Sequence, residues 1–135
     1  MSENLLVDRR PDGTTFLYLK GRLDAETAPQ VEDWIDQVLA KRPWRLVFDL
    51  ERLSYISSAG VRILLKARKQ MSARSGTTVV AKPQPSVKRV FDLLHVLNVN
   101  EMFDNEKDLD AYLDSVQRDE AQAAAGDEPS GAPRG

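Results

Sequence analysis

The sequence predicts an α/β fold, a mixed β-sheet of four to five strands covered by about four helices. The main observation is that the hydrophobic period changes repeatedly between strand-like and helix-like spacing along the chain. A second is the nearly continuous apolar run at residues 46–50, which is typical of a strand covered on both faces. Where consecutive strands are parallel, the helices between them should form right-handed crossovers.

The first elements are a hairpin and a helix. Residues 5–7 and 16–19 are apolar, and the turn residues Pro11, Asp12 and Gly13 lie between them, so we expect two paired strands. Apolar side chains at helical spacing then predict a helix that ends near Pro43. The residues on its apolar face are Val31, Ile35, Val38 and Leu39.

The second half alternates strands and helices. After the strand at residues 46–50 we expect a short loop and then a helix that opens on Ser57 and Ser58. Ser75 and Gly76 are a plausible stop for that helix, before a β-branched strand at residues 77–81. Two further helices and a short strand near residues 102–103 complete the prediction. The helical stripes are Val61, Leu64, Leu65 and Arg68, then Val87, Val90, Phe91 and Leu94, then Leu109, Tyr112, Leu113 and Val116.

Length and composition favour one globular domain. The chain has 135 residues, of which 41% are hydrophobic and 30% charged, as in ordinary single-core domains. The domain is expected to span residues 1–117. Residues 118–135 are rich in Ala, Gly, Pro and acidic side chains and have almost nothing large and apolar to bury, so a disordered tail is expected there.

Composition also excludes several kinds of function. The chain has no apolar run of about 18 residues and no apolar leader, which predicts a cytoplasmic protein without membrane contact. It has no cysteine and a single histidine, His95, so neither a metal centre nor a cofactor is expected. The net charge of −2 gives no reason to expect nucleic acid. We therefore expect protein partners.

Two serines at a predicted helix start are the candidate site. A helix N-terminus has unpaired backbone N–H groups and about half a positive charge, and the same donors that bind a serine hydroxyl can stabilise a phosphate. Ser57 or Ser58 could be a structural N-cap, the commoner role of serine at such a position. Either could also be a phosphorylated residue that switches a surface.

The same residues carry a family resemblance. The strand, the loop and the run Ser-Ser-Ala-Gly-Val at residues 57–61 resemble the signature of the STAS domain, in the branch of bacterial anti-sigma-factor antagonists. Ser58 stands on that family's phosphorylated serine, Gly60 stands on its glycine, and Ser57 stands where the family usually has aspartate. The Gly-Arg-Leu-Asp segment at residues 21–24 resembles a second family segment. The likeness covers roughly residues 5–117.

The resemblance implies a regulatory protein that is not an enzyme. In its unphosphorylated form it would bind an anti-sigma factor that is also a serine kinase, and so free a sigma factor. The kinase would end the binding by phosphorylating Ser58, or less favourably Ser57, and a phosphatase would reset the switch. The partner-binding residues that the resemblance implies are Asp24, Ser57, Ser58, Ala59, Gly60 and Val61.

Alternatives stay open at this point. Asp24 could be a turn or cap residue for the helix that follows it. A phosphorylation-independent STAS adaptor subunit of a lipid-transport ABC complex would keep the fold and lose the switch. The sequence decides neither the oligomeric state nor whether Trp34 and Trp44 anchor an interface or seal the core. Nor does it say whether the basic residues Lys66, Arg68 and Lys69 are more than a solvated helix face.

Two rival classes have less support. Asp49, near the end of a central strand, resembles a receiver-domain phosphoacceptor, but Asp8 is followed by Arg9 and Arg10 where a magnesium-binding carboxylate pair would be needed. Ser58 with His95 suggests a hydrolase, but the Gly-x-Ser-x-Gly motif is absent and nothing holds the histidine near the serine. The sequence favours a binding module.

Overall fold

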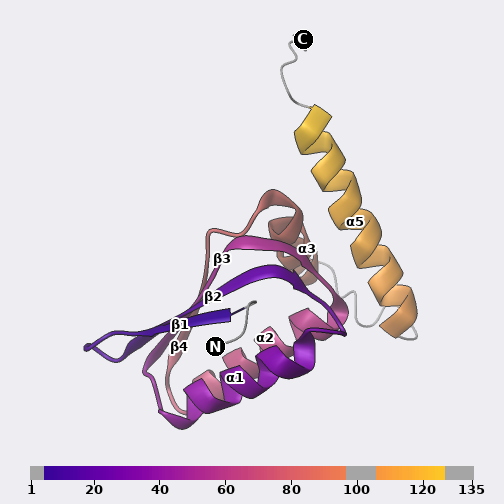
Figure 1. Cartoon of the computed structure of the whole chain (residues 1–135). Coiled ribbons are helices and arrows are strands. Elements are labelled where there is room, and N and C mark those ends of the chain that lie inside the picture. The colour runs from indigo at the N-terminus through magenta and orange to yellow at the C-terminus, as the bar shows by residue number, and fades with distance from the viewer. Residues whose placement is uncertain (1–4, 97–105, 127–135) are drawn as a thin grey trace. The chain divides into compact units, whose positions relative to one another are not determined.

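The computed structural model describes residues 5–96 and 106–126. The chain forms two compact units, Met1–Gln84 and Pro85–Gly135. Among these described residues, the first unit has a four-stranded sheet and two helices (Figure 1), and the second has two helices. The strands are β1 (Leu5–Arg9), β2 (Thr14–Leu23), β3 (Arg45–Ile56) and β4 (Thr77–Ala81), and the helices are α1 (Ala28–Ala40), α2 (Ser58–Ala73), α3 (Pro85–Val96) and α5 (Glu106–Gly126). The mixed sheet with four helices confirms the predicted fold class.

The predicted hairpin is present. β1 and β2 are antiparallel, with Leu5 opposite Leu19. In the turn, the Asp12 carboxylate accepts a hydrogen bond of 2.9 Å from the backbone N–H of Thr14. Gly13 has φ of +91°, a conformation that favours glycine. Asp12 and Gly13, two of the three turn residues that the sequence identified, therefore each have a local physical role.

The sheet has the order β1-β2-β3-β4. β3 is parallel to both of its neighbours, β2 and β4. The predicted apolar strand at residues 46–50 is fully buried. Contrary to the sequence prediction, no loop follows Leu50, because β3 continues to Ile56 beside β2. The exposed residues Glu51 and Arg52 interrupt the apolar run, and this conceals the rest of the strand from a hydrophobicity pattern.

The extended pairing of β2 and β3 includes two register shifts, between Tyr18 and Lys20 and between Gly21 and Arg22. Gly21 has φ of +81°, which permits the irregular backbone at this point. Beyond the shifts, Leu23 lies opposite Ile56. The two strands therefore end level with one another, and the segments that follow them start at the same edge of the sheet.

Helices α1 and α2 lie side by side along one face of the sheet (Figure 1). The predicted buried face of α1 is confirmed, with Val31 and Ile35 both buried. An ion pair of 2.7 Å between Lys66 and Glu32 joins the two helices at the surface. The buried face of α2 differs from the predicted stripe, because Leu65 is 41% exposed and the buried apolar side chains are Val61, Ile63, Leu64, Ala67 and Met71.

The predicted stop of α2 is also confirmed. Ser75 has φ of +61°, and the backbone N–H of Gly76 donates to the carbonyl oxygen of Met71 at 2.7 Å. A Cβ at Gly76 would lie 2.7 Å from the Met71 side chain. The chain then enters β4, as the sequence predicts.

In the described part of the second unit, helices α3 and α5 pack against each other. The apolar residues Val87, Val90, Leu109 and Leu113 are buried, in agreement with the two predicted helical stripes. Helix α5 continues to Gly126, past residue 117 where the sequence placed the end of the domain. The strand expected near residues 102–103 and the side chain of His95 lie outside the described residues.

Within residues 5–96 and 106–126, no helix is long and apolar enough to cross a membrane. The same part of the chain holds no group of three or more histidine, cysteine, aspartate or glutamate side chains arranged to bind a metal ion.

Candidate functional site

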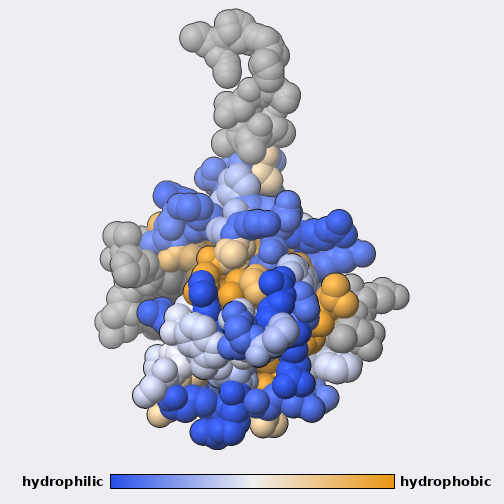
Figure 2. All heavy atoms as spheres, turned by 90° about the vertical axis from the view of Figure 1, so that its left-hand side faces the viewer, coloured by the Kyte–Doolittle hydropathy of each residue, from blue (hydrophilic) through white to orange (hydrophobic). Residues whose placement is uncertain are grey.

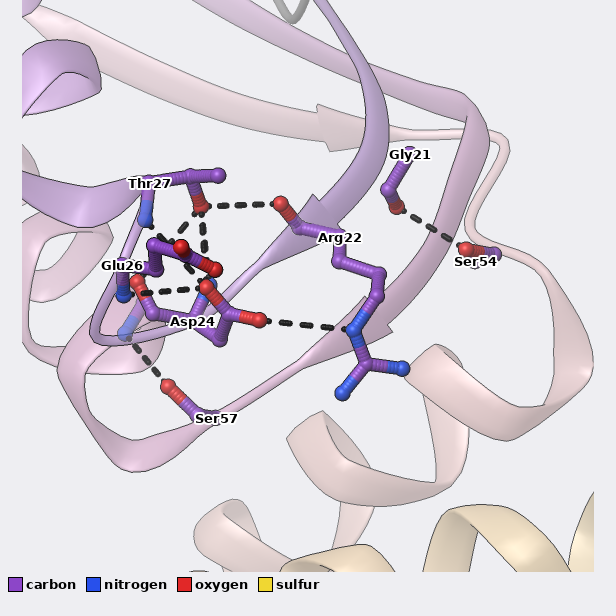
Figure 3. Close-up of polar contacts among 8 residues, drawn as sticks. Gly21, Arg22, Asp24, Glu26, Thr27, Ser54 and Ser57 are labelled. Carbon is purple, nitrogen blue, oxygen red and sulfur yellow. Dashed lines mark hydrogen bonds and ion pairs between the residues drawn. The ribbon is translucent and has the colours of Figure 1, made fainter.

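The predicted site residues meet at one edge of the sheet. β2 leads into α1 through Asp24, and β3 leads into α2 through Ser57. Because the carboxyl ends of parallel strands meet at the same edge, the two segments lie together (Figure 3). The backbone N–H of Ser57 donates to the carbonyl oxygen of Leu23 at 2.9 Å, which extends the pairing of β2 and β3 by one bond.

Ser57 is the N-cap of α2. Its backbone is extended, with φ of −100° and ψ of 179°, and its Oγ accepts a hydrogen bond of 3.4 Å from the backbone N–H of Gly60. Its carbonyl oxygen accepts the first helical bond, from Val61, at 2.9 Å. Of the two serines, Ser57 therefore has the structural role that serine often has at a helix start.

Ser58 is the first residue of α2. Like Ser57 it is only 5% exposed. Its hydroxyl lies in the first turn, where the backbone N–H groups of the helix have no partner within the helix and favour negative charge. An enzyme that modifies this hydroxyl needs the first turn of α2 to move, because the residue is buried in this conformation.

Gly60 is required by packing. A Cβ at this position would lie 2.8 Å from each of three atoms, namely Leu23 Cγ, the Leu23 carbonyl oxygen and Ile56 Cγ1. The absence of a side chain lets the first turn of α2 lie directly against the ends of β2 and β3. Val61 is buried as well, whereas Ala59 is half-buried. Gly60 and Val61 thus shape the site from within.

Asp24 organises the turn before α1. Its Oδ1 accepts hydrogen bonds from the backbone N–H groups of Glu26, at 3.0 Å, and Thr27, at 3.2 Å. Thr27 Oγ1 in turn accepts a bond of 3.0 Å from the Asp24 backbone N–H and donates to the Arg22 carbonyl oxygen at 2.9 Å. Asp24 is therefore a turn residue that orders the chain at the start of α1, which was the structural alternative from the sequence.

The environment of Asp24 keeps it ionised. Burial raises the pKa of its carboxyl, but hydrogen bonds from Thr27 and Glu26 and the nearby Arg22 guanidinium outweigh that effect, and the pKa lies below its ordinary value. The carboxylate is half-buried and carries its charge at neutral pH. A fixed negative charge therefore lies beside the segment that carries the two serines.

Sequence reasoning missed Arg22 as part of the site. Its Nε donates to Asp24 Oδ2 at 3.3 Å, and its guanidinium lies 3.9 Å from the centre of the Tyr55 ring. Figure 3 shows the guanidinium on one side of the Asp24 carboxylate and the backbone of Glu26 and Thr27 on the other. Arg22 and Tyr55 are register partners in β2 and β3, so only the unrecognised extension of β3 could have revealed this contact.

The site thus has two layers. The buried layer holds the two serines and Gly60 at the start of α2. The more exposed layer holds Arg22, Asp24 and Tyr55, which supply a cation, an anion and an aromatic ring at the same edge. Such a surface suits recognition of another protein, since aromatic and arginine side chains are enriched in binding hot spots.

Comparison with known proteins agrees with the fold. The sequence profile of the STAS domain matches residues 6–109. BtrV of Bordetella bronchiseptica, a candidate anti-sigma factor antagonist, is 35% identical over 88 residues, which cover 65% of this chain and 76% of BtrV.

Two solved structures have a similar fold. The anti-sigma factor antagonist from Mycobacterium paratuberculosis superposes with a TM-score of 0.59 and 30% identity, over 84% of this chain and 92% of that one. The Bacillus cell fate determinant SpoIIAA, solved in its phosphorylated form, has a TM-score of 0.58 and 24% identity, over 67% of this chain and 82% of that one. Because the STAS profile matches most of its length, this chain belongs to the STAS domain family.

Proposed function

We propose that this protein is an anti-sigma factor antagonist that binds an anti-sigma factor and is switched off by phosphorylation of Ser58. The relatives named as anti-sigma factor antagonists support the first part. The observation that supports the switch at Ser58 is that the two serines have different structural roles. Ser57 Oγ is engaged as the N-cap, and Ser58 occupies the first helical position beside it.

A phosphate on Ser58 would alter the surface in a defined way. It adds about −1.5 to −2 charges at the N-terminus of α2, where backbone N–H groups can stabilise it. The Asp24 carboxylate at the same edge is already ionised, so the negative charge of the partner-facing edge would rise sharply. Like charges across an interface can cost several kcal/mol, and each 1.4 kcal/mol is about a factor of ten in affinity. A loss of that size would move the complex from mostly bound to mostly free.

The proposed partner is an anti-sigma factor that is also the kinase for Ser58. A phosphatase would restore the unmodified form, and the exchange would take place in the cytoplasm. The protein itself acts by binding and not by catalysis. The partner-binding surface would comprise Asp24 and Ala59, with Arg22 and Tyr55 beside them, while the buried residues Ser57, Gly60 and Val61 hold the first turn of α2 in place.

The test is a pull-down from native lysate with the wild type, Ser58→Ala and Ser58→Asp as baits, read by mass spectrometry. Ser72→Asp is the matched control, because Ser72 is an exposed serine near the other end of α2. We expect the wild type, Ser58→Ala and Ser72→Asp to retain an anti-sigma factor and Ser58→Asp to lose it. Equal retention by all four would contradict the phosphorylation switch, and capture of no anti-sigma factor by any bait would contradict the antagonist function.

A further inference from the structure

A second surface lies at the opposite end of the sheet from the serines. The hairpin turn, the start of β3 and the ends of α1 and α2 all lie at this end, because β2 and β3 are parallel. β2 has ten residues, so at about 3.3 Å per residue the two ends are roughly 30 Å apart. We call the group Arg10, Asp12, Phe16, Trp44 and Arg45 the hairpin-end surface.

The hairpin-end surface is hollowed. An open cavity of about 440 Å³ is lined by Arg10, Pro11, Asp12, Thr14, Phe16 and Arg45. Figure 2 faces the left-hand side of Figure 1, where the hairpin turn lies, and shows apolar residues between hydrophilic ones on this face. The volume is large enough for a few side chains of a partner.

Basic side chains gather at this end, although the chain as a whole has a net charge of −2. The exposed cations are Arg9, Arg10, Lys41, Arg42 and Arg45. The two acidic residues of the hairpin already have partners within it. Asp8 pairs with Arg10 at 2.9 Å, and the Asp12 carboxylate accepts the Thr14 N–H, which together with nearby arginines keeps its pKa below the ordinary value. The surplus charge of this end is positive.

The surface also has a rigid apolar anchor. Trp44 is 53% exposed, yet its Nε1 donates to the Asp12 carbonyl oxygen at 2.7 Å. The indole packs so close to the turn that a Cβ at Gly13 would lie 2.6 Å from Trp44 Cδ1. An exposed tryptophan that is already fixed loses little conformational entropy on binding, which is the property of a hot-spot residue.

The aromatic and basic groups are also ordered relative to each other. The Arg10 guanidinium lies 4.2 Å from the centre of the Phe16 ring, and Phe16 stacks on Tyr18 with ring centres 6.0 Å apart. Arg42 has φ of +57°, a conformation in which glycine would be less strained. Arg42 directly follows the C-cap of α1, where a left-handed residue commonly ends a helix, and its backbone N–H donates to the Leu39 carbonyl oxygen at 2.9 Å.

We propose that the hairpin-end surface is a second protein-docking site, which binds an acidic segment of a partner that also carries an apolar side chain. A carboxylate of such a segment pairs with Arg45 at the cavity, and the apolar side chain packs on Trp44, which lies against the hairpin turn beside the cavity. The hollow shape favours a protruding peptide over a flat lipid surface. Asp8 and Asp12 repel negative charge. A peptide can place its few carboxylates away from them, whereas a nucleic acid carries a negative charge at every phosphate.

This site does not depend on the serines. The two surfaces are separated by the length of β2, so one molecule could hold an anti-sigma factor at one end and an acidic partner at the other. Ser58→Asp should leave binding at the hairpin-end surface unchanged, which separates this proposal from the proposed function.

The test uses the full chain and a fluorescently labelled peptide of glutamate and leucine as the probe, with binding measured by anisotropy. Arg45→Gln and Trp44→Phe are the test variants. Lys69→Gln is the matched control, because it removes an exposed cation from α2. We expect Arg45→Gln to weaken binding about tenfold, the loss of a charge-assisted hydrogen bond. Trp44→Phe should weaken it severalfold, and Lys69→Gln should change it less than twofold.

Three results would overturn the proposal. One is the absence of saturable binding by the peptide. Another is an equal loss of peptide affinity in Arg45→Gln and Lys69→Gln, which would show that the peptide responds to the net charge of the protein and not to a specific site. The third comes from parallel titrations with phosphatidylserine vesicles and single-stranded DNA, if either binds through Arg45 more tightly than the peptide does.

Discussion

Gly60 packs so closely against Leu23 that a Cβ added to Gly60 would lie only 2.8 Å from the Leu23 carbonyl oxygen. This relationship connects the end of β2 to the first turn of α2, although the two residues are far apart in the sequence. It means that the backbone of the turn that carries both serines is in contact with the sheet. The glycine of the site is thus explained by packing against Leu23 and Ile56.

Gly60→Ala should therefore destabilise the protein. Alanine ordinarily stabilises a helix relative to glycine by up to about 1 kcal/mol, but overpacking in a core costs about 1–3 kcal/mol. We expect a net loss of about 1–2 kcal/mol in the free energy of unfolding by urea. Ala59→Gly, in the same turn but without that contact, measures the helix propensity alone. An unchanged or increased stability of Gly60→Ala would show that the turn can move away from β2.

Ser57→Ala should cost about 0.5–1 kcal/mol of unfolding free energy, the lower part of the range for an N-cap, because the Ser57 Oγ to Gly60 N–H bond is long at 3.4 Å. Ser57→Asp should restore the loss, since aspartate is also a good cap. Urea unfolding of the three proteins measures both effects. If Ser57→Asp were less stable than Ser57→Ala, the hydroxyl would have another role.

The Asp24 carboxyl should make the free energy of unfolding depend on pH. Its pKa in the folded state is below the unfolded value of about 3.9, so the unfolded state binds more protons in this range and stability rises with pH. The contribution is complete above about pH 4 to 5 and is lost as pH falls through the folded pKa. Asp24→Asn keeps the Oδ1 acceptor but cannot titrate.

We therefore expect the wild type to be more stable than Asp24→Asn at pH 7, and the difference to shrink as the pH falls below about 4. Thermal unfolding of the two proteins across that range is the measurement. A difference that stayed constant with pH would mean that the charge of Asp24 contributes nothing to folding.

Arg42→Gly should stabilise the protein by about 1 kcal/mol, because Arg42 has φ of +57° and glycine adopts that conformation without the penalty of a side chain. Lys41→Gly is the control at the neighbouring position, where φ is −84° and glycine should destabilise. Unfolding in urea compares them. A loss of stability in Arg42→Gly would show that contacts of the arginine side chain outweigh the strain.

The sequence alone predicts those helices and strands whose apolar side chains recur at a clear helical or strand spacing. The hairpin, α1 and the strand at residues 46–50 each followed from apolar spacing and turn residues. The second half of β3 was missed because Glu51 and Arg52 face solvent and break the pattern. Pairing with β2 determines this part of the strand, and no local property of the sequence reports that pairing.

The candidate site shows the same limit. Ser57, Ser58 and Asp24 could be selected from the sequence because caps and turns are local features. Arg22 could not, because its contact with Tyr55 depends on the register of two strands that also contain bulges. The assignment of Ser57 as the cap and of Gly60 as a packing position likewise depends on contacts with neighbouring segments.

The burial of Ser58 has a consequence for timing. Any enzyme that acts on this hydroxyl has to wait for the first turn of α2 to open, and each 1.4 kcal/mol of opening cost lowers the reactive population about tenfold. In the proposed switch, the fold would then set the delay between the arrival of a kinase and the loss of binding. Substitutions that loosen this turn would shorten the delay without touching either the kinase or the serine.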